Sequence, residues 1–76
     1  MWLKLQERSA DKKDLFNMAH VYRIESDGTG HAKLLYENGE WIITVESKET
    51  VEDMLDAAIR GYPGVVSEED AFEAAR

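Results

Sequence analysis

Apolar and polar residues alternate along several stretches in the first two thirds of the chain. In the first of these, residues 2–7, Leu3 and Leu5 lie on one side and polar residues lie between them. Successive side chains of a strand point to opposite faces of a sheet, so this period of two predicts a strand with one buried face. The same period predicts further strands over residues 20–25, 30–36 and 41–46.

The dipeptide Asn38-Gly39 separates the last two of these strands and predicts a hairpin with a two-residue type I′ turn. This register brings three pairs onto one face, which we expect to form the core: Tyr36 with Trp41, Leu34 with Ile43, and Ala32 with Val45. The opposite face then carries Leu35 across from Ile42, with Lys33 and Thr44 beside them and Val21 from the preceding strand.

The preceding turn, SDGTG at residues 26–30, must contain an odd number of residues if Tyr22 and Ile24 are to join the core face. A three-residue loop such as Asp27, Gly28 and Thr29 meets this condition. Three strands then form a meander, and the strand at residues 2–7 is expected to pair at one edge. Residues 8–14 are charged without a period, which predicts a loop between them. The predicted sheet has about four antiparallel strands.

From Ser47 onwards the period of apolar residues changes from 2 to 3.6. The apolar stripe of a helix is formed by Val51, Met54, Leu55, Ala58 and Ile59. Ser47 or Thr50 is suited to cap the start of this helix, and Gly61 to end it. A short last helix is predicted over residues 67–76. The expected fold is therefore a single α+β domain, residues 1–76, with one amphipathic helix packed on the sheet and a short C-terminal helix.

Composition narrows the functional classes. The chain has 76 residues, 16 acids, 9 bases and no cysteine, with a net charge of −7. Residues 1–46 hold eight acids and six bases, a net −2, whereas residues 47–76 hold eight acids and three bases, a net −5. Direct binding to nucleic acid needs lysines and arginines against the phosphates, so the acidic balance argues against it. A basic protein surface suits the charge better, although a negative charge also serves solubility alone.

The absence of cysteine excludes a disulfide framework and a cysteine-based zinc site, and suits a reducing cytoplasm. No apolar run has the length of a membrane span, so no membrane contact is expected.

Candidate chemistry is sparse. The two-residue turn would place His31 opposite Glu46, a pairing that resembles a base with its orienting carboxylate or two ligands of a metal. No nucleophile, third ligand or phosphate-binding loop accompanies them, and a surface cross-strand pair is the simpler interpretation. We therefore expect no enzymatic activity, no catalytic or metal-binding residues and no cofactor.

Two surfaces are candidates for contact with a partner. The first is the outward face of the hairpin around Leu35 and Ile42, which is also open to interpretation as an ordinary solvated face. The second is the acidic side of the predicted helices, which is equally typical of the wet side of an amphipathic helix. Its members are Glu49, Glu52, Asp53, Asp56, Glu68, Glu69, Asp70 and Glu73.

Over residues 1–60 the chain resembles the small FlbD-type proteins of bacterial flagellar operons. The resemblance rests on a short leading strand, "FNMAHVYRIE", a hairpin and "NGEWIITVESKETVEDMLDAAI". It implies a small sheet-plus-helix fold and a regulatory, non-enzymatic role, and it supplies no functional residues.

The layout also resembles small phage anti-CRISPR proteins, in particular a type I-F inhibitor. The shared features are the "YENG" hairpin, a charged helix that ends in a Gly-x-Pro-Gly turn at residues 61–64, and a short final helix. In that family a hairpin tyrosine and a following strand glutamate belong to the surface that blocks the CRISPR surveillance complex. The resemblance transfers these roles to Tyr36 and Glu46.

The sequence thus predicts a non-enzymatic, acidic, cytoplasmic inhibitor of the phage anti-CRISPR or anti-defence type, which covers a basic nucleic-acid-binding surface of a protein partner. That partner is a CRISPR surveillance complex or another nucleoprotein. The alternative is an FlbD-like regulatory or adaptor domain that acts through protein binding or as a homodimer. The predicted contact residues are Leu35, Ile42, Tyr36, Glu46, Glu49, Glu52, Asp53, Asp56, Glu69 and Asp70.

Overall fold

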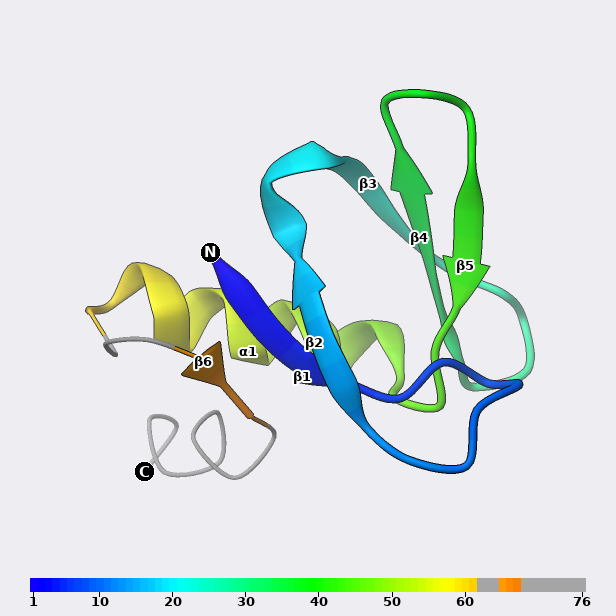
Figure 1. Cartoon of the computed structure of the whole chain (residues 1–76), viewed down its shortest axis with the longest axis horizontal. Helices are drawn as coiled ribbons and strands as arrows, with labels where there is room; N and C mark the ends of the chain where they lie inside the picture. The colour runs from blue at the N-terminus through cyan, green and yellow to red at the C-terminus, as the bar shows by residue number, and fades with distance from the viewer. Residues whose placement is uncertain (62–64, 68–76) are drawn as a thin grey trace.

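The protein has an α+β fold, and its described part is built from short strands and one α-helix (Figure 1). This computed structural model describes residues 1–61 and 65–67. A short 3-10 helix, Met18–His20, leads into β3. The elements in chain order are β1 (Trp2–Leu5), β2 (Asp14–Asn17), β3 (Val21–Ser26), β4 (Ala32–Tyr36), β5 (Trp41–Ile43), α1 (Lys48–Ile59) and β6 (Val65–Val66).

The described strands form two three-stranded sheets, with orders β2-β1-β6 and β3-β4-β5, in place of the predicted single sheet of about four strands. β1 runs antiparallel to β2 and parallel to β6. Neither β2 nor β6 was predicted, because β2 begins in the charged segment and β6 has only two residues.

The two sheets meet where the chain continues beyond β1. Glu7 bridges Thr44, the Val45 amide donates to the Gln6 carbonyl at 2.7 Å, and the Arg8 amide donates to the Ile43 carbonyl at 2.8 Å. The predicted edge pairing of the first strand with the meander is therefore confined to this short extension.

The β3–β4 connection keeps the predicted parity. The Asp27 amide donates to the His31 carbonyl at 3.0 Å, so the loop is Gly28–Gly30, three residues long and one position later than predicted. Ile24 lies on the inner face, as expected, and the later loop places it opposite Leu34. Tyr22, predicted to lie in the core, is 64% exposed, because the register shifts between Val21 and Arg23.

The β4–β5 hairpin has a longer turn than predicted. Leu35 lies opposite Trp41 and Leu34 opposite Ile42. The Tyr36 amide donates to the Glu40 carbonyl at 2.9 Å, which makes residues 37–39 a three-residue loop. Its one left-handed residue is Gly39, with φ of 91°, whereas a type I′ turn needs positive φ at both central residues.

This one-residue difference inverts the faces of β5 and leaves those of β4 unchanged. Trp41, predicted to lie in the core, is 55% exposed, and Val45 is 43% exposed. Ile42, predicted to point outward, packs against the core. Ile43 is buried, but on the outer side, since it lies across from Lys33.

The helix α1 begins as predicted. The Ser47 hydroxyl accepts a hydrogen bond from the Thr50 amide at 3.1 Å and caps the helix, and Gly61, with φ of 100°, follows its end. Its buried side chains are Val51, Met54 and Ala57, which pack under the β3-β4-β5 sheet. Ile59 was predicted in this stripe but is 74% exposed, because Ala57 faces the core in its place.

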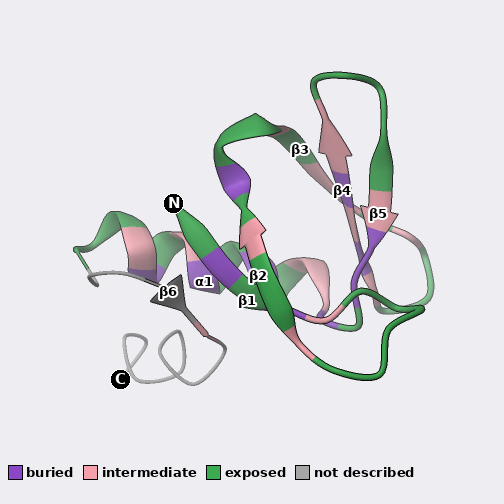
Figure 2. Ribbon diagram, in the orientation of Figure 1, coloured by how far each residue is buried: buried purple, intermediate pink, exposed green. Residues whose placement is uncertain are grey.

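One core joins both sheets to the helix. Figure 2 shows buried segments of β1 and α1, which belong to the same cluster of side chains. Its fully buried members include Leu3 and Leu5 from β1, Ala32 and Leu34 from β4, and Val51 and Met54 from α1. The predicted helix over residues 67–76 lies, apart from Ser67, outside the described residues.

Candidate functional site

The outward face of the hairpin consists of Leu35, Trp41, Lys33 and Ile43. Leu35 is half-buried and lies across from the exposed Trp41. The Lys33 ammonium sits 4.5 Å from the centre of the Trp41 ring, which is a cation–π geometry. Leu35 was predicted on this face, but its neighbour is Trp41 and not Ile42. The sequence contains the clue to this difference, since Glu37-Asn38-Gly39 also fits a three-residue loop with glycine last.

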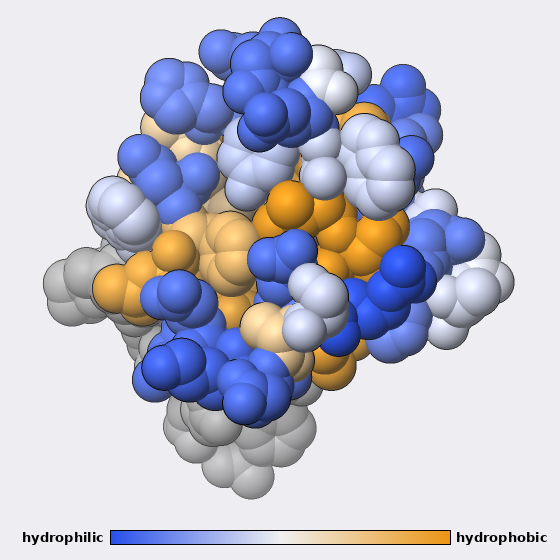
Figure 3. Space-filling model, turned by 45° about the vertical axis from the view of Figure 1, so that its right-hand side comes forward, coloured by the Kyte–Doolittle hydropathy of each residue, from blue (hydrophilic) through white to orange (hydrophobic). Residues whose placement is uncertain are grey.

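Apolar side chains also reach the surface elsewhere. Figure 3 shows apolar residues gathered in the middle of one side of the molecule with hydrophilic residues around them. Outside the hairpin, Ile59 and Tyr22 are the most exposed large apolar side chains, and Leu15, Met1 and Trp2 follow at 50%, 49% and 46%.

Tyr36 lies on the inner side of β4, as the sequence predicted, but it is only half-buried. Burial raises the pKa of its hydroxyl, and the negative charge of Glu7 raises that pKa further. Tyr36 also lines a hollow of about 490 Å³ with Phe16 and His20. Within this hollow, His20 Nδ1 lies 3.7 Å from the Glu37 carboxylate, and both side chains are largely exposed.

Glu46, a predicted contact residue, is buried, with 3% of its side chain exposed. Its two carboxylate oxygens accept hydrogen bonds from the Gln6 backbone amide at 3.0 and 3.2 Å, and the Lys13 ammonium lies 3.9 Å away. The inverted faces of this strand turn Glu46 inward, where it links the end of β1 to the start of α1. The carboxylate is thus directed into the protein and away from any partner's surface.

The predicted pairing of His31 with Glu46 is not formed. The register places His31 near Val45, and His31 Nδ1 lies 3.1 Å from the Val45 carbonyl oxygen. Across residues 1–61 and 65–67, no three histidine, aspartate or glutamate side chains are grouped so as to hold a metal ion. No helix in this described part is long and apolar enough to cross a membrane.

The outer side of α1 carries four exposed acids, Glu49, Glu52, Asp53 and Asp56, which we call the acidic helix face. Two of them pair with a cation one helical turn away. The Lys48 ammonium lies 3.8 Å from the Glu52 carboxylate, and the Arg60 guanidinium lies 2.9 Å from the Asp56 carboxylate. The other two, Glu49 and Asp53, form no ion pair within the described residues. Glu69 and Asp70, also predicted contact residues, lie outside the described residues.

The structure separates the two predicted contact surfaces. The helix α1 packs on the inner side of the β3-β4-β5 sheet, so the acidic helix face points away from that sheet. The outward face of the hairpin points in the opposite direction, because Lys33 and Leu35 alternate with the inward-facing Ala32 and Leu34. One flat partner surface therefore contacts one of the two faces at a time.

Searches with protein-family models, against curated proteins and against solved structures found no significant match.

Proposed function

We propose that this protein is a non-enzymatic inhibitor that binds a basic protein surface through its acidic helix face. The surface it covers normally contacts nucleic acid, as in a CRISPR surveillance complex, and the site of action is the cytoplasm. Inhibition is by occlusion, since a lysine or arginine engaged by a carboxylate no longer neutralises a phosphate.

The observation that carries this proposal is the pair Glu49 and Asp53. They lie four residues apart on the same side of α1, both exposed, with no cation paired to either among the described residues. Like charges at this spacing destabilise a helix by a few tenths of a kcal/mol. Glu49 gains from its place in the first turn, but Asp53 lies beyond that turn. Helix stability does not favour this pair, and a cation supplied by a partner would relieve its repulsion.

The geometry also supports occlusion over small-molecule chemistry. The four carboxylates project from one rigid helix that is capped by Ser47 and anchored by buried Val51 and Met54. A rigid display of charge suits fast, electrostatically steered association, which weakens steeply with salt.

The test is competition with target DNA for a purified type I CRISPR surveillance complex, followed by fluorescence anisotropy of labelled DNA. We expect the protein to displace DNA at about 50 mM salt and to lose most of its effect at about 300 mM salt, where surface charges are screened. We expect the double variant Glu49→Lys/Asp53→Lys to lose inhibition.

The matched control is Glu37→Lys/Glu40→Lys, which changes the net charge equally but lies at the exposed hairpin tip. It should inhibit as wild type does. Equal loss of inhibition in both double variants would show that net charge alone causes the effect. No inhibition by the wild-type protein would show that a type I CRISPR surveillance complex is not its target.

A further inference from the structure

Strand β3 is at the edge of its sheet. Within the described strands, its one sheet neighbour is β4. Asp27 is hydrogen-bonded to His31, and ladder bonds alternate along an antiparallel pair, so Glu25 and Arg23 direct their backbone groups toward β4. The backbone groups of Ile24 and Ser26 consequently point away from the sheet. Such an edge is a template for another strand.

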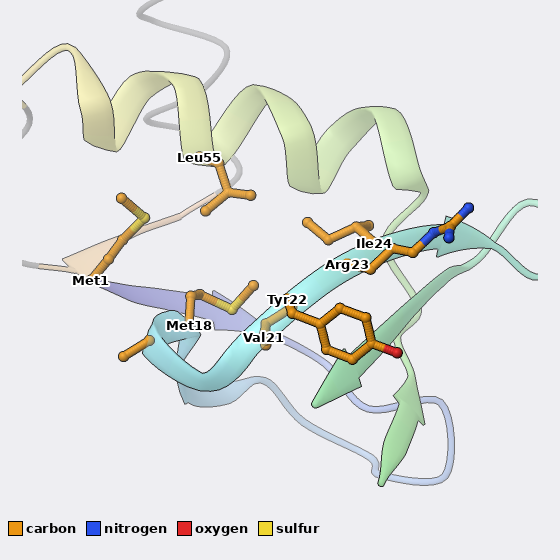
Figure 4. A pocket seen from close by; sticks show the side chains of 8 residues that line it. Met1, Met18, Val21, Tyr22, Arg23, Ile24 and Leu55 are labelled. Carbon is orange, nitrogen blue, oxygen red and sulfur yellow. The ribbon is translucent and has the colours of Figure 1, made fainter. Parts of the chain in front are cut away.

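An apolar groove runs along this edge, between β3 and α1. It has a volume of about 400 Å³, and Figure 4 shows side chains from the N-terminus, the 3-10 helix, β3 and α1 around it. Met1, Met18, Val21, Ile24 and Leu55 supply most of its apolar lining. Ile59, one turn beyond Leu55, extends the apolar side of the helix and is 74% exposed.

The charges on β3 favour one occupant of this edge. Arg23 and Glu25 lie on the outer face, with Arg23 Nε 3.6 Å from the Glu25 carboxylate. When a second β3 pairs antiparallel with Ile24 opposite Ile24, each Arg23 falls opposite the Glu25 of the other copy. These two positions form a non-hydrogen-bonded pair, in which side chains approach most closely.

Neighbouring registers are disfavoured. A shift by two residues in one direction sets Arg23 against Arg23, and a shift in the other direction sets Glu25 against Glu25. Like charges directly across a strand pair are destabilising. The edge is therefore self-complementary in one register, with backbone groups of Ile24 directed at their counterparts.

We propose that a second copy of this chain occupies the β3 edge and its groove. The β3-β4-β5 sheets of the two copies then join into one continuous sheet through antiparallel β3–β3 pairing about a two-fold axis. Residues directly opposite one another point to the same face, so both Ile24 side chains lie on the groove side, beside Leu55 of α1. The proposal does not depend on the acidic helix face, which lies on the other side of α1.

The test is sedimentation equilibrium of the full chain from about 1 µM to about 1 mM, the range in which a small interface dissociates. We expect the wild-type mass to rise with concentration from 8.7 kDa toward twice that value. Arg23→Glu alone, or Glu25→Arg alone, sets like charges across the axis and should raise the dissociation constant about tenfold or more.

Charge exchange makes the test specific to this register. The double variant Arg23→Glu/Glu25→Arg restores opposite charges and should dimerise as wild type does. An equimolar mixture of the two single variants should form a mixed dimer, since one copy then carries two acids and the other two bases. Glu49→Arg, on the outer side of α1, is the control and should leave the dimer unchanged.

Two outcomes would overturn the proposal: a wild-type mass of 8.7 kDa at every concentration, or a dimer that both single variants leave intact. Specific binding of a peptide from another protein to a monomer, in place of self-pairing, would also overturn it. None of these results bears on DNA displacement by the acidic helix face, so the two proposals fail separately.

Discussion

At the scale of single residues, Glu46 links segments that are 40 positions apart, because its carboxylate accepts the Gln6 amide with both oxygens. We expect Glu46→Ala to lower the free energy of unfolding by about 1.5–3 kcal/mol, the usual range for a hydrogen bond to a charged group. Urea denaturation at neutral pH measures this change. Glu40→Ala, an exposed acid on the hairpin, should stay within about 0.5 kcal/mol of wild type. Equal midpoints for the two variants would contradict this structural role.

Asp27 ties the β3–β4 loop together and gives the fold a dependence on pH. Its carboxylate accepts from the Thr29 hydroxyl at 2.7 Å, the Thr29 amide at 2.8 Å and the His31 amide at 3.1 Å. These hydrogen bonds lower the pKa of Asp27 below 3.8, and the bond from the Thr29 hydroxyl has the largest effect. A lowered pKa in the folded state means that the stabilisation is complete above pH 3.8 and is lost as the pH falls through the folded value.

We therefore expect Asp27→Asn to melt below wild type at pH 7, and the gap in Tm to narrow as the pH falls below 3.8. Circular dichroism melts across this pH range measure the gap. A gap that widens with acidity would show that the ionised carboxylate does not stabilise the loop.

Several buried apolar residues could be predicted from the sequence, and the buried Glu46 could not. The burial of Leu3, Leu5 and Leu34 follows from the alternation of apolar and polar residues. Removing apolar side chains from water is favourable whichever sheet the strand joins. Glu46 is buried only because a backbone amide 40 residues earlier meets it, and no local pattern encodes that meeting.

At the scale of elements, the hairpin turn decides which side chains face outward. Gly39 has φ of 91° and open space where a Cβ would lie, so Gly39→Ala should cost only the left-handed backbone penalty, about 1–2 kcal/mol. Asn38 has no positive φ, and Asn38→Ala loses one exposed hydrogen bond to the Glu40 amide, worth about 0.5–1 kcal/mol. Urea denaturation of both variants tests the register, since a two-residue turn would impose the left-handed penalty at both positions.

The hairpin itself was predicted correctly, and its register was not. Asn38-Gly39 is compatible with a two-residue and a three-residue loop, and both keep Leu34 on the inner face of β4. The choice between them lies in tertiary packing: the observed register buries Thr44 and Glu46 against the β1 extension. That extension also explains why the strands divide into two sheets, since Gln6–Arg8 reaches β5 only at its end.

At the scale of the whole molecule, the acidic character is uneven across the surface. The described acids of the second part of the chain lie on α1, whereas the outer face of the β3-β4-β5 sheet mixes Arg23, Glu25 and Lys33 with Trp41. The charge difference between the two parts could be predicted from the sequence. The opposite orientation of the two faces follows from the alternation along β4, which the sequence also predicted, whereas the place of Trp41 on the outer face follows from the β5 register and was not predicted. The two proposed contacts, one with a basic partner and one with a second copy, therefore use separate surfaces.

If the acidic helix face binds a basic partner, as we propose, binding and stability should oppose each other at Asp53. In Asp53→Lys the like-charge pair with Glu49 becomes a Glu-to-Lys pair four residues apart, the favourable order on a helix. We expect the free energy of unfolding to rise by about 0.4–1 kcal/mol, since the lost repulsion and the new attraction each contribute about 0.2–0.5 kcal/mol. The same change should weaken displacement of DNA from the surveillance complex. Urea denaturation at low and high salt measures the change in stability, which should shrink as salt screens the charges.

Glu40→Lys is the control, since it has the same change in net charge but no helical neighbour, and it should leave stability within about 0.5 kcal/mol of wild type. If Asp53→Lys is no more stable than Glu40→Lys, then Glu49 and Asp53 do not repel each other, and the main support for binding through this face is lost.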